Sequence, residues 1–211
     1  MKFYDVHRNL GAITLMFTLL SFVGCSSFKA ERVSDAGADE KAMTITDHWV
    51  DGDTNLVIAE TMKQVNSHPR LIKYKSSHPG KDIKLFVGVV ANNTSEAYFP
   101  GKDLEEALLN QVSKSDVFVL VDAEQRSRLL KEITYQNDGM VDPAQAKTIG
   151  KQSGADMMIF GSINMKPEER DGRKIKTYAV NFRLTEIQSS EEVCRTRTTV
   201  SKYSQQSASG W

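Results

Sequence analysis

The sequence predicts a small mixed β-sheet with helices on its faces, a fold of the α/β (α+β) class, and two patterns lead to this prediction. Residues 83–91, 117–121 and 157–163 are short, nearly continuous apolar runs rich in β-branched residues, which is typical of strands covered on both faces. Residues 175–187 instead alternate between apolar and polar side chains, which is typical of a strand buried on one face. Because segments with helical spacing separate the apolar runs, we expect helices on the faces of the sheet and an antiparallel hairpin at its C-terminal side.

The expected helices are placed by apolar side chains at helical spacing and by polar residues that can cap their first turns. Residues 67–81 contain prolines and a glycine and are expected to form an irregular connector. The helices are expected at residues 55–66, capped by Asp53 or Thr54; at 103–112, with a capping-box pattern of Asp103 and Glu106; at 123–134, capped by Asp122; and from Asp142-Pro143 to Gly154.

The C-terminal third is expected to be a hairpin with a charged tip. Asp171-Gly172 is a hairpin-turn signal inside a dense charge cluster over residues 166–176. Residues 188–190 are expected to turn the chain, and 193–200 to return as the partner strand. On the alternating strand, the side chains expected to point inward are Tyr178, Val180, Phe182 and Leu184.

The N-terminus carries a targeting pattern. Residues 10–25 form an uncharged apolar run that follows a short basic segment and ends in Gly24-Cys25, the order of a signal peptide with a small-residue processing site. A cysteine after a small residue resembles a bacterial lipobox, so we expect cleavage before Cys25 and a lipid, with palmitate, on this cysteine. The alternatives are ordinary secretory cleavage and a permanent membrane anchor, for which the run is short of the roughly 20 residues needed. Ser26 after the cysteine implies the outer membrane under the sorting rule of Gram-negative lipoproteins.

These patterns divide the chain into four parts. We expect a signal peptide at residues 1–24, a lipidated flexible tether at 25–47, one globular domain at 48–203 and a frayed tail at 204–211. The full sequence carries 27 basic and 27 acidic residues, so it offers no global field that would attract nucleic acid. Cys194 is the only cysteine in the sequence besides Cys25, and two cysteines are too few for a cysteine-rich metal site.

No pattern in the chain predicts catalysis or a bound cofactor. None of the four histidines has metal-ligand spacing to a second ligand, and no GxSxG, GxGxxG or GxxxxGK[ST] motif is present. Asp122 and Asp156 flank apolar runs, where α/β enzymes place catalytic carboxylates, but a capping or turn role is the simpler interpretation. We therefore expect a non-enzymatic binding module that folds without a metal or a cofactor.

Two exposed segments are candidates for contact with a partner. Asn92, Asn93 and Thr94 follow the first expected strand and could form a local turn, in which asparagine side chains bond the backbone, or a contact loop. Arg170 and Arg173 lie at the expected hairpin tip, which could be a solvated turn or a polar docking surface.

Three further arginines could share the outer face of the hairpin. Arg183, Arg195 and Arg197 alternate with inward positions on the two expected strands. They could contact acidic groups on a partner, or they could face solvent and discourage aggregation through the sheet edge.

Six segments carry a resemblance to a known family. They are HW at 48–49, FVGVVANNT at 86–94, LEEALLN at 104–110, VFVLVDAE at 117–124, AKTIGKQSGADMMIFGS at 146–162 and EEVC at 191–194. In this order and spacing the chain resembles the LpoB family of outer-membrane lipoprotein activators of peptidoglycan synthases. It departs from the family at Cys194, where the family often has tryptophan, and in its short tether.

The resemblance implies a lipid-anchored protein that faces the periplasm. Such a protein would dock on a peptidoglycan synthase, a penicillin-binding protein, and activate it in cell-wall synthesis. The alternative function is an outer-membrane assembly or secretion accessory lipoprotein. Neither function involves nucleic acid, and in both the membrane is reached through the lipid.

Overall fold

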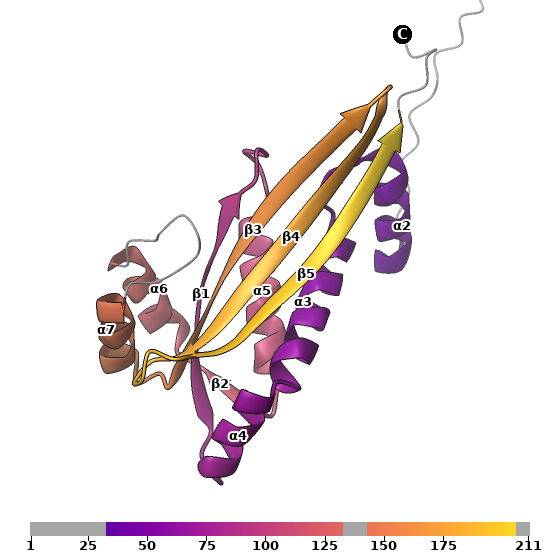
Figure 1. The fold of residues 1–211 in the computed structure, drawn as a ribbon. Helices are drawn as coiled ribbons and strands as arrows, with labels where there is room; N and C mark the ends of the chain where they lie inside the picture. The colour runs from indigo at the N-terminus through magenta and orange to yellow at the C-terminus, as the bar shows by residue number, and fades with distance from the viewer. Residues whose placement is uncertain (1–32, 133–142, 206–211) are drawn as a thin grey trace, which may run out of the picture. The chain divides into compact units, whose positions relative to one another are not determined.

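One five-stranded sheet organises the described part of the chain (Figure 1). The computed structural model describes residues 33–132 and 143–205, and the unit that begins at Asp35 holds all their helices and strands. The strand order is β2-β1-β3-β4-β5, with β1 parallel to β2 and β3, and with β4 antiparallel to both β3 and β5. The strands are β1 (Ile83–Asn93), β2 (Phe118–Leu120), β3 (Met157–Arg170), β4 (Arg173–Glu186) and β5 (Glu192–Gln205). The predicted mixed sheet with a C-terminal antiparallel hairpin is confirmed.

The described helices cover the two faces of the sheet unequally. The face that packs on α3 and α5 buries the larger apolar cluster, which includes Tyr178, Val180, Phe182 and Leu184 as predicted. The other face meets α6 and α7 through a smaller cluster centred on β1 and β3. The helices are α2 (Asp35–Ile45), α3 (Asp51–Asn66), α4 (Pro69–Ser77), α5 (Gly101–Ser113), α6 (Ala123–Glu132) and α7 (Pro143–Ser153).

Two helices occur where the sequence predicts none. Residues 67–81 are not an irregular connector, because α4 starts with Pro69 at a first-turn position, where the missing N–H of proline is tolerated. His68 caps this helix, and its Nδ1 accepts a hydrogen bond of 3.4 Å from the backbone N–H two residues later. Within the segment 25–47, which is expected to be a tether, Asp35–Ile45 forms the helix α2.

Several element boundaries also differ from the prediction. α3 begins at Asp51, so Asp53 and Thr54 lie inside its first turn instead of preceding it. The Asp53 carboxylate accepts a hydrogen bond from the Val50 N–H at 2.9 Å. β5 continues to Gln205, two residues into the expected tail, because β4 extends far enough to pair with it. The last residues of the expected helix 123–134 and the expected cap Asp142 lie outside the described residues.

The two aspartates that flank apolar runs have structural partners. Asp122 Oδ1 accepts hydrogen bonds from the backbone N–H groups of the second and third residues after it, at 3.0 and 3.1 Å, so its predicted capping role is confirmed. Asp156 Oδ2 accepts a hydrogen bond from the Lys84 N–H at 3.0 Å, and Oδ1 pairs with Lys81 at 2.7 Å. Asp156 thereby ties the start of β3 to the start of β1.

The register of β1 on β3 shifts between Val87 and Val90, and side chains from two helices satisfy the backbone there. The Glu105 carboxylate of α5 accepts a hydrogen bond from the Val90 N–H at 3.0 Å, and Arg126 of α6 donates to the Val87 carbonyl. Glu105 and Arg126 pair with each other at 3.4 Å. Burial raises the pKa of Glu105, although the Val90 N–H and Arg126 act in the opposite direction.

Gly88, inside this register shift, is expected to be intolerant of a side chain. A methyl group on Gly88 would lie 2.1 Å from carbons of the Phe160 ring, which is buried in the smaller cluster. We expect Gly88→Ala to lower the free energy of unfolding by about 1–3 kcal/mol in urea titrations, because the ring must move. The matched control is Gly101→Ala, where the nearest atom, the Val90 carbonyl oxygen, is 3.4 Å away. Equal stability of the two variants would contradict the steric argument.

Candidate functional site: the open face of the sheet

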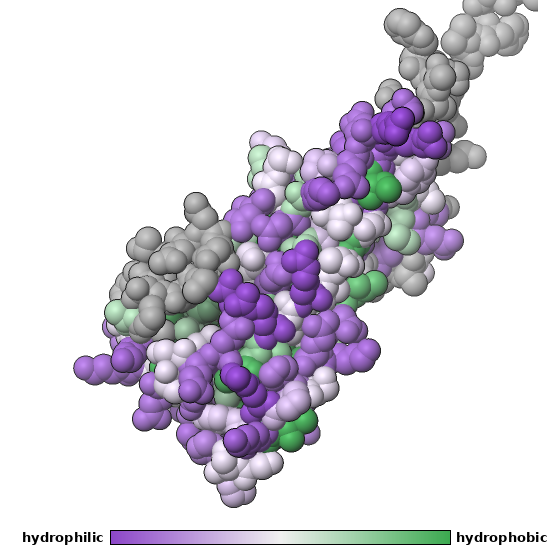
Figure 2. Space-filling model, in the orientation of Figure 1, coloured by the Kyte–Doolittle hydropathy of each residue, from purple (hydrophilic) through white to green (hydrophobic). Residues whose placement is uncertain are grey.

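In the described part of the chain, the sheet face that carries α6 and α7 is uncovered over the outer strands. The smaller apolar cluster reaches β3 only through Met158 and Phe160. In Figure 1 the strands β3, β4 and β5 lie in front of α5, and Figure 2 shows mostly hydrophilic side chains over them. We call this surface the open face; pairing across the strands places on it Asn164, Lys166, Thr177, Asn181, Arg183, Arg195, Arg197, Thr199 and Ser201, together with the buried Ser162.

Three arginines give the open face its positive charge. Arg183 of β4 pairs directly with Arg195 of β5, and Arg197 pairs with Asn181, whose side-chain oxygen lies 3.4 Å from Arg197 Nη1. The prediction that these arginines share the outer face is confirmed. Arg195 also forms an ion pair of 2.8 Å with Glu192 but keeps a side-chain exposure of 56%. Guanidinium groups held on a sheet in this way suit carboxylates on another molecule.

The hairpin tip continues the same face. Arg170 and Arg173 pair across the Asp171-Gly172 turn, in which both residues have positive φ as a hairpin of this type requires. The Arg170 side chain is 91% exposed. Beside it Ile175 pairs with Tyr203, both exposed, and this end of the hairpin is hollowed by a pocket of about 560 Å³.

The segment of Asn92, Asn93 and Thr94 divides between two roles. Asn92 Oδ1 accepts hydrogen bonds from the Thr94 N–H at 2.9 Å and from its hydroxyl at 2.6 Å, and Asn92 Nδ2 donates to the Glu96 carbonyl at 2.9 Å. These contacts match the local-turn interpretation for Asn92 and Thr94. Asn93 pairs with Asn164 and is exposed, so it extends the open face onto β1.

A second polar cluster, which we call the Lys176 cluster, ties together Asp47, His48, Glu96, Lys176 and Tyr178. The Lys176 side chain is 5% exposed, and its Nζ lies 2.9 Å from Glu96 Oε1 and 3.0 Å from Asp47 Oδ1. Glu96 Oε1 also accepts a hydrogen bond from the Tyr178 hydroxyl at 2.9 Å and lies 3.0 Å from His48 Nδ1. The cluster joins the segment before α3, the loop after β1 and strand β4.

Burial and pairing act against each other in the Lys176 cluster. Burial alone would raise the pKa of Glu96 and of Asp47, but the hydrogen bonds and charge of Lys176 leave both values below their ordinary range. Burial alone would lower the pKa of Lys176, but the two carboxylates leave it raised. Burial and Glu96 together raise the pKa of Tyr178, so its hydroxyl remains a donor. The arrangement is a set of satisfied charges that locks three segments together.

Sequence reasoning missed this cluster, although one signal for it was present. Lys176 occupies the same side of β4 as Tyr178 and Val180, so a lysine stands in a row of buried positions. A charge at such a position needs partners, and the pattern alone could not say which ones.

Trp49 packs beside the Lys176 cluster. Its ring centroid lies 5.2 Å from that of Phe99 and 5.3 Å from that of Tyr178, both in edge-to-face geometry. Its Nε1 donates a hydrogen bond of 2.8 Å to Thr54 Oγ1 at the start of α3. The indole N–H therefore has a hydrogen-bond partner although the residue is buried.

Metal binding, membrane crossing and thiol chemistry can be judged for residues 33–132 and 143–205, which the structure describes. Within them no group of three or more histidine, cysteine or acidic residues is arranged to hold a metal ion, and no helix is both long and apolar enough to cross a membrane. Cys194 is buried, and this burial, with the charge of Glu192, raises the pKa of its thiol, which makes it a weak nucleophile. Cys25, the expected lipidation site, lies outside the described residues.

A comparison with protein families connects these surfaces to a known group. The family model described as peptidoglycan-synthase activator LpoB matches residues 53–200, more than two thirds of the chain. This chain belongs to the LpoB family. Membership supports the general role of a peptidoglycan-synthase activator, and the LpoB family is a family of regulatory activators. The LpoB match runs from α3 into β5 and includes Lys176 and all of the open face except Ser201, whereas Asp47 and His48 precede it.

Solved structures include relatives of the same family. LpoB C-terminal domains from Salmonella enterica and Escherichia coli are each 20% identical to this chain, with TM-scores of 0.44 and 0.43. The matches cover 63% and 64% of this chain, and 93% and 96% of those domains. Lipoprotein GNA1162 from Neisseria meningitidis is 13% identical over 60% of this chain and 88% of its own, with a TM-score of 0.42. A search of curated protein sequences gives no significant match.

Proposed function

We propose that this LpoB-family protein docks on a peptidoglycan synthase of the penicillin-binding protein class through its open face. The observation that carries the proposal is an uncovered, polar and positively charged sheet surface inside the region that the family model matches. A surface on paired strands is rigid, so little ordering cost opposes binding. Carboxylates on the synthase are the groups that Arg183, Arg195 and Arg197 would bind.

Activation in this proposal needs binding alone. A synthase that exchanges between inactive and active conformations is shifted toward the active one by any partner that binds this conformation more tightly. A tenfold preference corresponds to about 1.4 kcal/mol, which a few charged contacts can supply. No side chain of the activator needs to transfer a proton or a group.

The docking surface extends beyond the three arginines. We propose Arg170 and Arg173 at one end of the open face, and Asn93 with its neighbours Asn92 and Thr94 on β1, as further contacts. Asn92 and Thr94 hold the loop, so their side chains contribute by positioning Asn93. Loops and strand ends on a rigid scaffold commonly carry binding residues.

An activity assay with purified components tests the proposal. The chain should bind the periplasmic docking region of a synthase from the same bacterium and should raise the rate of glycan polymerisation or cross-linking. A chain that neither binds nor stimulates any such synthase would contradict the proposal. The alternative, an assembly or secretion accessory, would then be tested by identifying the proteins that co-purify with it from membranes.

We further propose that residues 1–24 are removed as a signal peptide and that a lipid on Cys25 holds the protein on the outer membrane, facing the periplasm. Several acyl chains together give firm attachment at about 0.8 kcal/mol for each buried CH₂. The tether of this proposal now includes the helix α2 before the domain that starts near residue 48.

Cys25→Ala is expected to abolish lipidation. With no thiol to carry the lipid, the variant should incorporate no labelled palmitate and should remain an unprocessed or mislocalised precursor. Metabolic labelling followed by membrane fractionation measures both results. The matched control is Cys194→Ala, which should label as the unaltered protein does because Cys194 is buried in the sheet. Equal labelling of the Cys25→Ala variant would overturn the anchor.

A further inference from the structure

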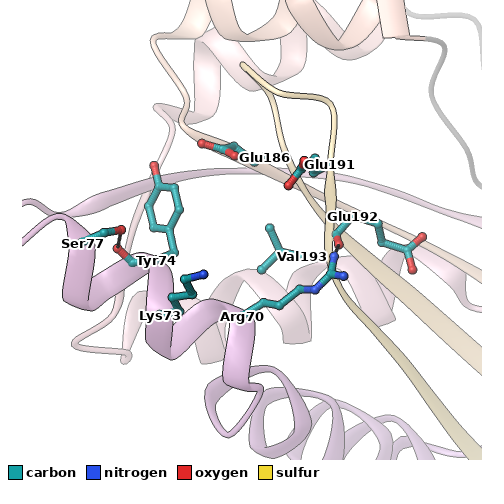
Figure 3. A pocket seen from close by; sticks show the side chains of 8 residues that line it. All are labelled: Arg70, Lys73, Tyr74, Ser77, Glu186, Glu191, Glu192 and Val193. Carbon is teal, nitrogen blue, oxygen red and sulfur yellow. Dashed lines mark hydrogen bonds between the residues drawn. The ribbon is translucent and has the colours of Figure 1, made fainter.

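The end of the sheet opposite the hairpin tip carries a pocket that the proposed function does not use. Its volume is about 630 Å³, within the range of pockets that hold small ligands. One wall is a single face of α4, and the other is the connection from β4 to β5 (Figure 3). The lining residues are Arg70, Lys73, Tyr74 and Ser77 from α4, and, on the other wall, Glu186 at the end of β4, Glu191 in the connection, and Glu192 and Val193 at the start of β5.

Some charges of this pocket already have partners. Arg70 Nη1 donates a hydrogen bond of 3.0 Å to the Glu192 carbonyl, which joins the two walls. The Glu192 carboxylate pairs with Arg195 at 2.8 Å. The Glu186 carboxylate accepts a hydrogen bond of 2.6 Å from the Ser189 hydroxyl. These contacts fix the positions of the two walls relative to each other.

Three other groups face the pocket without a partner among the described residues. They are the Lys73 ammonium, the Glu191 carboxylate and the Tyr74 hydroxyl, for which no hydrogen bond or ion pair occurs there. In Figure 3 the Lys73 amine and the Glu191 carboxylate point into the pocket from opposite walls, and the Tyr74 ring stands at one end. A cation and an anion on opposite walls match a ligand that carries both a carboxylate and an amine.

A second hollow extends the pocket toward α7. It has a volume of about 440 Å³ and shares Tyr74 and Glu186 with the first, so the two hollows adjoin at these residues, and we call them together the groove. Lys147 and Lys151 of α7 line its far side. The Tyr74 ring stacks on His78 with a centroid distance of 4.4 Å and is therefore held in place between the two hollows. An elongated groove with alternating charges suits an extended ligand more than a compact one.

We infer that this groove binds a short peptide that has free carboxylates and a free amine, with Lys73 holding a carboxylate and Glu191 holding the amine. The peptide of uncross-linked peptidoglycan has this chemistry, because it carries several carboxylates and the amine of a diamino acid. This choice of ligand source rests on the proposed function. Peptide binding at this end of the sheet leaves the open face available, so the activator could sense uncross-linked wall while it contacts the synthase.

The test is a titration of the purified full chain, in mild detergent and without synthase, with the tetrapeptide L-Ala-γ-D-Glu-diaminopimelate-D-Ala. Calorimetry should show saturable binding. Lys73→Met and Glu191→Gln should each weaken binding about fivefold, the size expected for one exposed charged contact. The matched control Lys75→Met, on the same helix but outside the pocket, should bind as the unaltered chain does.

Acetylation of the peptide amines separates a specific contact from general charge attraction. For the unaltered chain, the acetylated peptide should bind about fivefold more weakly than the free peptide. For the Glu191→Gln variant, the acetylated and the free peptide should bind with nearly equal affinity, because the contact between the amine and Glu191 is already lost. Absence of saturable binding at millimolar peptide, an equal loss in Lys75→Met, or an acetylation effect that persists in Glu191→Gln would overturn the inference. Equal binding of an all-L peptide with the same charges would overturn its assignment to peptidoglycan. Because no synthase is present, failure here is distinct from failure of the docking proposal.

Discussion

Lys176→Met is expected to lower the free energy of unfolding by about 3 kcal/mol or more, because it leaves two partly buried carboxylates without their cation. Lys176 Nζ lies within 3.0 Å of both Glu96 and Asp47, and its side chain is 5% exposed. Urea titration of the purified chain at neutral pH measures the change. The loss should appear as a lower midpoint with an unchanged slope if the variant still folds as one unit.

An exposed ion pair on the neighbouring strand provides the control. Lys166 Nζ lies 2.6 Å from Glu168, but the two side chains are 77% and 61% exposed. Such pairs are worth about 0–1 kcal/mol, so Lys166→Met should change the stability little. If both variants lost the same stability, burial of the Lys176 cluster would not be the cause. A triple variant, Lys176→Met with Glu96→Gln and Asp47→Asn, should recover part of the loss, since no buried charge remains unpaired.

The same cluster predicts a direction for the pH dependence. Folding lowers the pKa of Glu96 and of Asp47, so the stability they contribute is present above the ordinary carboxyl pKa of about 4 and is lost as the pH falls through the folded values. In Lys176→Met these carboxyls have lost their cation, so protonating them no longer breaks a pair. The difference in stability between the unaltered chain and Lys176→Met should therefore shrink as the pH falls from about 5 through the lowered folded pKa values of the two carboxyls. A difference that stays constant over this interval would contradict the assignment.

Reversing two charges on the open face is expected to weaken binding to the synthase by about tenfold or more, through loss of attraction and gain of repulsion. Arg195→Glu with Arg197→Glu is the sharpest variant, because both side chains are exposed on the edge strand β5. The effect should be largest at low salt, where exposed charges are screened least. Surface binding measurements at two salt concentrations, with thermal unfolding to confirm the fold, test this expectation.

Charge reversal elsewhere provides the comparison. Lys102→Glu with Lys114→Glu changes the net charge by the same amount on exposed positions in and just after α5, on the opposite side of the sheet. This variant should bind with nearly unchanged affinity. Arg170→Glu with Arg173→Glu should weaken binding as well, because the hairpin tip continues the open face. Equal losses in all three variants would show attraction by net charge alone and would contradict a localised docking surface.

The strands and the hairpin could be predicted because their signals are local. An apolar run of five to nine residues, an alternating pattern and an Asp-Gly turn each describe one segment, and all appear in the structure. The helix α4 could not be predicted from composition, because the prolines and the glycine at 67–81 favour an irregular connector, whereas Pro69 stands at a permitted first-turn position. Helix α2 was missed because its sequence buries little apolar surface, and composition alone favoured a flexible segment.

The surfaces could be predicted only in part, because they are assembled from distant segments. The three arginines of the open face lie on adjoining strands, so alternation was enough to place them on one side. The Lys176 cluster joins residues 47, 96 and 176, and no local pattern connects segments separated by 49 and 80 positions. The groove beside α4 depends on a helix that the sequence did not predict, so it could not be foreseen at all.

The position of Trp49 makes the protein its own optical probe. An indole packed edge-on against Phe99 and Tyr178, and hydrogen-bonded to Thr54, emits from an apolar, constrained environment. The only other tryptophan in the sequence is Trp211, which can be removed as Trp211→Phe, and excitation at the red edge of the absorption band avoids the tyrosines. The remaining emission spectrum would then follow the junction of the segment before α3, α3 itself and the Lys176 cluster without any added dye. Separation of that junction under acid or by mutation should be visible as a red shift, even where the rest of the sheet stays folded.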